Sequence, residues 1–219
     1  MQINNFFKAI IIILLGALGG TIAWLFVFKN QPASVQLINK EERIYIEENA
    51  ALVNAIKSVK DSVVVVKTEY KQKEIQGFGL VLTADGLVVT LAENVPQGSQ
   101  TSISIRGENN ITYQVLKRNL ENNLALIKVD RNNLQTKGFF DLSKLETGER
   151  IFVLFDGVNE GIVKSFNDSL IKTNIIEIET ISGAPAFDVK GEVVGIGDKD
   201  TNNFVNIIPI TKIKSFAGL

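Results

Sequence analysis

A serine stands in a turn of small residues near the end of the chain, in the stretch Ser182-Gly183-Ala184-Pro185-Ala186-Phe187. An Asp-x-Lys-Gly turn at 188–191 and an apolar stretch at 192–197 follow it, which together predict a β-hairpin. Small residues around a lone serine let the backbone approach other groups closely, as the loop of a nucleophile requires. The pattern therefore indicates nucleophilic catalysis through Ser182, or else an ordinary hairpin with a serine in its lead-in turn.

The residue types that would support such a nucleophile are scarce in this chain. Its 219 residues carry a net charge of -1 and include no cysteine and no histidine. The absence of histidine removes the usual general base of hydrolases and the commonest metal ligand, so we expect no metal and no cofactor. The near-neutral charge gives no bulk electrostatic reason to bind nucleic acid, and we expect no nucleic-acid partner.

The N-terminal part differs sharply from the rest. Residues 9–28 are twenty apolar or small residues in a row, with Thr21 as the one polar exception, which is long enough for a helix that spans a bilayer. The run is long for a signal peptide and no clear cleavage site follows it. We therefore expect an uncleaved transmembrane anchor at 1–29, then a polar tether at 30–46 and a short amphipathic helix from about Glu47 to Lys60.

From Ser62 onward the pattern is that of short β-strands separated by turn signals, which favours an all-β sandwich or a pair of barrels. An Asp-Gly hairpin turn is expected at Thr83-Ala84-Asp85-Gly86. The expected strands are 63–66, 79–82, 87–90, 102–106, 111–116, 124–129, 150–155, 161–166, 170–174 and 203–208, with a final helical turn at 210–216.

Several of these segments, in this order, resemble the protease domain of the HtrA/DegS-like trypsin-like serine proteases. The Ser182 turn is similar to the Ser-Gly-Gly-Pro nucleophile loop of that family. Residues 77–82 resemble its Gly-Ser-Gly hairpin, 87–95 its strand ending in Thr-Asn-x-His-Val, and 123–129 its Asp-Leu-Ala-x-x-Lys strand. Further segments that fit the family in order are 147–149 with 161–163, 171–174 and 209–210.

The resemblance covers about residues 47–215 and implies a trypsin-like double β-barrel. It places barrel 1 at about 62–130 and barrel 2 at about 145–213, within a protease domain at 47–219. Because the chain ends at Leu219, we expect it to lack the PDZ domain that is common in the family.

The departures from the family pattern fall on the chemistry. The resemblance assigns the catalytic triad to Glu93, Asn123 and Ser182, where the family has histidine, aspartate and serine, so Ser182 alone is retained. A carboxylate in water is a far weaker base than imidazole, and once ionised it cannot return a proton to the leaving amine. Asn123 cannot stabilise a developing cation as a carboxylate would.

The oxyanion hole is also expected to change. In the family it uses the backbone N–H groups of the serine and of the residue two before it, which here are Ser182 and Thr180. A β-branched residue resists the backbone conformations that glycine permits, so we expect a distorted hole.

We therefore expect a membrane-anchored pseudoprotease, which binds a peptide or protein partner at a strand edge without cutting it. One alternative is an active HtrA-type serine endopeptidase whose base is Glu93 or a lysine such as Lys172. Another is a structural assembly element. The resemblance implies a single-pass protein of the cell membrane, with its soluble domain outside the cytoplasm, and a homo-trimer.

Overall fold

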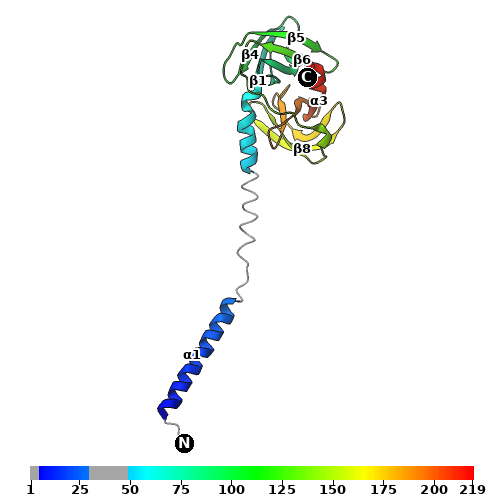
Figure 1. The fold of residues 1–219 in the computed structure, drawn as a ribbon. Helices are drawn as coiled ribbons and strands as arrows, with labels where there is room; N and C mark the ends of the chain where they lie inside the picture. The colour runs from blue at the N-terminus through cyan, green and yellow to red at the C-terminus, as the bar shows by residue number, and fades with distance from the viewer. Residues whose placement is uncertain (1–4, 30–48) are drawn as a thin grey trace. The chain divides into compact units, whose positions relative to one another are not determined.

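The computed structural model describes residues 5–29 and 49–219 (Figure 1). The chain divides into two compact units, Met1–Glu47 and Glu48–Leu219. The first contains helix α1 (Asn5–Lys29), whose apolar side chains from Ile10 to Leu15 are exposed. We expected a transmembrane anchor at 1–29, but among the described residues no helix combines the length and the apolar character needed to cross a membrane, so the anchor stays a prediction. The tether expected at 30–46 lies outside the described residues.

The second unit begins with the expected amphipathic helix, which spans residues 49–59. Ala55 and Val59 are buried, and Leu52 and Ile56 pack against the same core cluster. That cluster also contains Phe187 of the predicted serine hairpin. The apolar residues recur every three or four positions, so one stripe of the helix is buried against the β-structure.

The remainder of the unit is built from short strands, and each segment expected to be a strand forms one. The elements are β1 (Val63–Tyr70), β2 (Lys73–Val81), β3 (Leu87–Leu91), β4 (Gln100–Ile105), β5 (Tyr113–Asn119), β6 (Leu124–Val129), β7 (Arg150–Leu154), β8 (Val158–Phe166), β9 (Ile171–Ile176), β10 (Pro185–Asp188), β11 (Val193–Lys199) and β12 (Phe204–Pro209), with the 3-10 turns η1 (Lys60–Ser62), η2 (Ala92–Asn94) and η3 (Leu142–Lys144) and the C-terminal helix α3 (Ile210–Ala217).

Strands β1 to β6 form one sheet in the order β4-β1-β2-β3-β6-β5. We expected a closed barrel here, and the sheet is instead open between β4 and β5. The connection between these two strands passes through left-handed conformations at Arg106 and Asn110, and β5 is interrupted by a bulge at Leu116. Bulges bend and twist an edge strand, which opposes continuous pairing with β4. The sheet still curls around a buried core that includes Val66 and Ile127.

The remaining strands form the expected closed barrel, in the order β10-β11-β12-β9-β8-β7. Figure 1 shows β1, β4, β5 and β6 in one lobe and β8 in the other. A shared core joins the lobes, because one buried cluster contains Leu80 and Leu91 of the open sheet together with Phe152 and Phe187 of the barrel. The all-β class and the barrel arrangement therefore agree with the prediction, apart from the open edge of the first sheet.

Candidate active site

The turn that carries Ser182 is held tightly from both sides. Gly183 has a φ of 80°, and a Cβ atom there would collide with the carbonyl oxygen of Phe78, so only glycine fits. The Phe78 N–H donates to the Ser182 carbonyl oxygen at 2.7 Å. On the other side, Ile181 is fully buried in the core of the closed barrel. The serine is therefore presented by a turn with little freedom to move.

The hairpin after the serine forms as predicted and supports this turn. The buried Asp188 carboxylate accepts the N–H groups of Lys190 at 3.0 Å and Glu192 at 2.7 Å. The reversal brings β11 back beside the serine, where the Gly197 carbonyl accepts the Gly183 N–H at 2.9 Å. A local Asx-type turn thus sets the position of the strand that borders the site.

Glu93, expected at the position of the family's histidine, faces the serine. It lies in η2, directly after β3, and its Oε1 accepts a hydrogen bond from the Ser182 hydroxyl at 2.5 Å. The Glu93 side chain is exposed. Water can therefore compete with the Ser182 hydroxyl for this carboxylate.

Asn123, expected at the position of the orienting aspartate, is close to Glu93 but does not orient its side chain. The Asn123 Oδ1 accepts from the backbone N–H of Glu93 at 3.3 Å, and its Nδ2 donates to Asp198 Oδ2 at 3.3 Å. These contacts hold the turn around Glu93. In a working triad the third residue bonds to the side chain of the base, whereas here Asn123 bonds to the backbone N–H of Glu93.

Asp198, at the end of β11, is a residue of the site that the sequence analysis missed. Burial, and after it the negative charge of Glu93, raise the pKa of its carboxyl group. Asp198 is distant from Glu93 and Asn123 in the chain, and it reaches them because β11 lies beside the serine turn. The site therefore contains two carboxylates and no imidazole.

Asn94 is the second residue that was missed. It is fully buried, and its Nδ2 donates to Thr90 Oγ1 at 3.0 Å and to the Ser182 carbonyl at 2.9 Å. Its Oδ1 accepts from the Ser182 hydroxyl at 2.9 Å. The sequence did contain a signal for this residue. Asn94 is polar, whereas the family's Thr-Asn-x-His-Val segment has the apolar valine at that position.

The backbone just before the serine is held by Lys199. Its ammonium group donates to the carbonyl oxygens of Ile178 at 3.2 Å and Glu179 at 2.8 Å. Because a trans peptide unit points its C=O and N–H in opposite directions, the Thr180 N–H points away from Lys199. Within the described chain, neither the Thr180 nor the Ser182 N–H donates a hydrogen bond to another protein group. The distorted oxyanion hole stays a prediction.

The lysine considered as an alternative base lies elsewhere. Lys172 is an exposed residue of β9, in register with Ser165 of β8 and Asn206 of β12. No hydrogen bond or ion pair within 49–219 connects it to Ser182. The structure therefore does not bring Lys172 to the serine.

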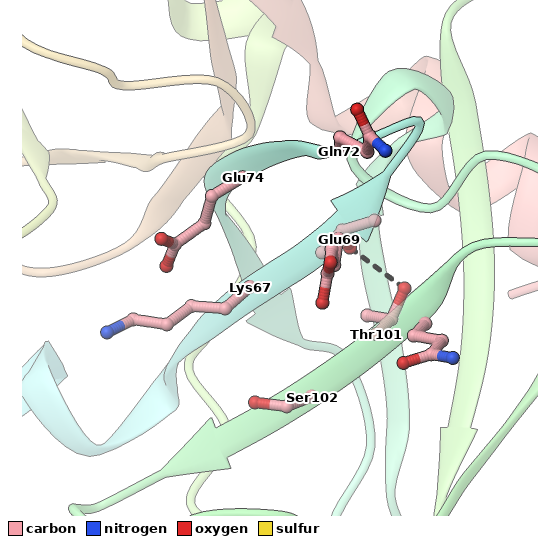
Figure 2. Close-up of a pocket in the computed structure, with 8 residues that line it drawn as sticks. Lys67, Glu69, Gln72, Glu74, Thr101 and Ser102 are labelled. Carbon is pink, nitrogen blue, oxygen red and sulfur yellow. Dashed lines mark hydrogen bonds between the residues drawn. The ribbon is translucent and has the colours of Figure 1, made fainter.

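A hollow of about 540 Å³ lies over β1, β4 and the β1–β2 hairpin, and Figure 2 shows the side chains of Lys67, Glu69 and Glu74 around it. Its lining includes neither Ser182 nor Glu93, so it is separate from the serine site. The hollow is polar and open, without the converging buried groups of a binding pocket, and we assign it no chemistry. In the part of the chain that the structure describes, no three acidic side chains gather as a metal site would require.

Comparison with known proteins agrees with this geometry. The family pattern called "Trypsin-like peptidase domain" matches residues 77–196, which is more than half of the chain. The chain therefore belongs to the trypsin-like peptidase family.

Named relatives refine the placement within that family. The chain is 30% identical over 145 residues to a protein of Pseudomonas putida strain F1 named "Probable periplasmic serine endoprotease DegP-like". It is 29% and 25% identical to proteins of the same name from Pseudomonas putida strain W619 and Halomonas elongata. These matches cover 59% of this chain but 30% of the length of each relative. The resemblance to HtrA-like proteases is thus confirmed at the level of the family.

Proposed function

We propose that this protein is a pseudoprotease, which uses a serine-protease scaffold to bind a peptide or protein without cutting it. The observation that carries the proposal is the environment of the Ser182 hydroxyl. Its neighbours are the exposed Glu93 carboxylate and the Asn94 amide oxygen, and Asn123 contacts the backbone of Glu93 instead of its side chain. A serine nucleophile needs a base that accepts its proton near neutral pH and later returns it, and the whole chain lacks histidine.

A short stretch of β11 beside the serine is the strand edge that we propose for binding. The register of β10 with β11 ends at Ile196, whereas β12 continues along β11 to Lys199. On the side that β10 leaves, Gly197 bonds to Gly183 and Ala184 of the serine turn, and the Lys199 N–H bonds to the Asp198 carboxylate. An extended peptide that adds beside Lys199 as a further strand would exchange the Asp198 contact for backbone hydrogen bonds, which supply the affinity.

The test uses the full chain in detergent and a library of fluorescently labelled peptides. We expect saturable binding by fluorescence anisotropy, no new peptide products by mass spectrometry, and the same result for Ser182→Ala. Cleavage that disappears in Ser182→Ala would show that the protein is an enzyme. A failure to bind any peptide or candidate protein would contradict the proposed role in binding.

A second candidate function is a serine endopeptidase that uses Glu93 as its base. The 2.5 Å contact between Ser182 Oγ and Glu93 Oε1 favours it, because that distance is within reach of proton transfer. Labelling by a fluorophosphonate probe between pH 4 and 8 tests this candidate. Labelling that is lost in both Ser182→Ala and Glu93→Gln supports it, and an unlabelled wild-type protein at every pH excludes it.

We further propose that residues 9–28 anchor the protein in the cell membrane, with residues 49–219 outside the cytoplasm. The unbroken apolar run and the exposed apolar side chains of α1 support the anchor, since such a surface is unfavourable in water. The periplasmic name of the relatives supports the location. Membrane fractionation and protease protection of spheroplasts test both points. The homo-trimer implied by the resemblance, or another structural assembly, would be detected by light scattering of the purified protein.

A further inference from the structure

The orientation of the Asn94 side-chain amide follows from a chain of hydrogen bonds. The Thr90 hydroxyl has one proton, which it donates to the Phe78 carbonyl at 2.5 Å. Thr90 Oγ1 can therefore only accept from Asn94, so the group of Asn94 that faces it is the NH2. The same NH2 also donates to the Ser182 carbonyl. The amide oxygen of Asn94 consequently faces the Ser182 hydroxyl as a fixed acceptor. Because this hydroxyl also has a single proton, the Asn94 oxygen at 2.9 Å and the Glu93 carboxylate at 2.5 Å compete for it.

The Asn94 amide also has no room to rotate away. The residue is fully buried, and a Cβ atom at Gly77 would collide with its carboxamide group. A buried amide with both ends bonded is costly to disturb, because rotation would leave buried polar groups without partners. Asn94 thus differs from Glu93, whose side chain is exposed and can exchange its bond to Ser182 for water.

We propose that Asn94 is a positioning residue that locks Ser182, holding its carbonyl with one end of the amide and its hydroxyl proton with the other. The inference rests on the proposed function, because it explains how a serine can be retained in a site that does not cut. Ser182 is then a hydrogen-bond donor that closes a buried network and joins β3 to the serine turn. If Glu93 were replaced by a better base, the Asn94 amide oxygen would still compete with that base for the proton of the Ser182 hydroxyl.

The first test replaces the hydroxyl by a thiol, whose ionisation can be followed directly. Ser182→Cys introduces the single thiol of the protein, since the chain has no cysteine. The rate of alkylation by iodoacetamide is measured from pH 5 to 10 in this variant and in Ser182→Cys with Asn94→Val. Removal of the fixed acceptor should lower the pH midpoint of alkylation, with about threefold more thiolate at pH 7.

The pH midpoint distinguishes the loss of the Asn94 hydrogen bond from a loss of packing. A looser turn changes the limiting rate of alkylation at high pH but leaves the midpoint unchanged. Ile181→Val is the matched control, since it perturbs a buried neighbour that makes no polar contact with residue 182. Its midpoint should stay that of Ser182→Cys alone. An unchanged or higher midpoint in the Asn94 variant would overturn the proposal. If Asn94→Val does not fold, Asn94→Ala serves in its place.

The second test is a double-mutant cycle on unfolding in urea with Ser182→Ala and Asn94→Val. Ser182→Ala leaves the buried Asn94 oxygen without a donor, so we expect the folding equilibrium constant to fall by about fivefold or more. In the Asn94→Val background the fall should be no more than about twofold. Equal losses in the two backgrounds would refute the lock. Neither test involves peptide binding or cleavage, so failure of the lock and failure of the proposed function are separate results.

Discussion

Gly183 offers a direct measurement of how tightly the serine turn is packed. Its φ of 80° is matched almost equally by Gly98, with a φ of 79°, in an exposed turn. A Cβ atom at Gly98 would have no atom within 4 Å, whereas one at Gly183 would collide with the carbonyl oxygen of Phe78. The pair therefore separates the cost of a left-handed backbone from the cost of steric overlap.

The two costs can be estimated separately. An L-residue in the left-handed region costs about 1–2 kcal/mol, and both Gly98→Ala and Gly183→Ala incur this cost. Overpacking of a buried site adds about 1–3 kcal/mol, and this applies to Gly183→Ala alone. The collision also pushes apart the hydrogen bond between Phe78 and the Ser182 carbonyl. We therefore expect Gly183→Ala to lower the free energy of unfolding by about 2–5 kcal/mol.

The assay is chemical denaturation of the full chain, followed by circular dichroism for the wild type and both variants under the same conditions. Gly98→Ala should lose about 1–2 kcal/mol, and the difference between the variants gives the steric term. Equal losses for the two variants would refute the assignment of Gly183 as a position closed by Phe78. A Gly183→Ala protein as stable as the wild type would also contradict the rigid serine turn described here.

Three further predictions concern charged groups around the site and at the hairpin turn 83–86. Burial and a neighbouring carboxylate raise the pKa of Asp198 above its usual 3.8, so its stabilising contribution is complete below about pH 4 and is lost as the pH rises through the raised value. The free energy of unfolding in urea should accordingly rise for Asp198→Asn relative to the wild type between pH 4 and pH 7. A difference between the two proteins that does not depend on pH would contradict this. Lys199→Met should speed backbone amide exchange in the loop around Ile178 and Glu179, whose carbonyls Lys199 binds. The control Lys190→Met, at an exposed position, should not. Equal exchange in the two variants would show that the bonds of Lys199 do not order the loop. The bond from Lys128, and after it the bond from Thr83, lower the pKa of Asp85 to about 2. In an NMR titration, Lys128→Met should therefore move the Asp85 midpoint part of the way up toward 3.8, and no movement would exclude Lys128 as a cause.

Much of the fold could be predicted from local patterns. The turn at 83–86 forms as the Asp-Gly signal indicates, with the Leu82 N–H bonded to the Leu87 carbonyl at 2.8 Å. Strand β6 has the predicted bounds, Leu124–Val129, because a run of apolar residues flanked by polar ones is buried as a unit. The open edge between β4 and β5 was not predicted, since whether two edge strands pair depends on the bulge and on the path of the chain between them.

The absence of an imidazole base is determined by the sequence alone, because a chain without histidine cannot place an imidazole beside its serine in any fold. The serine turn and its hairpin are also local, since their conformation depends on neighbouring glycines and on one aspartate. The surroundings of the Ser182 hydroxyl depend on tertiary structure. Asn94 lies 88 positions from Ser182 in the chain, and Asn123 lies 75 positions from Asp198. Such contacts arise only when the open sheet and the closed barrel pack together, since a hydrogen bond requires atoms about 3 Å apart and no sequence spacing encodes that distance.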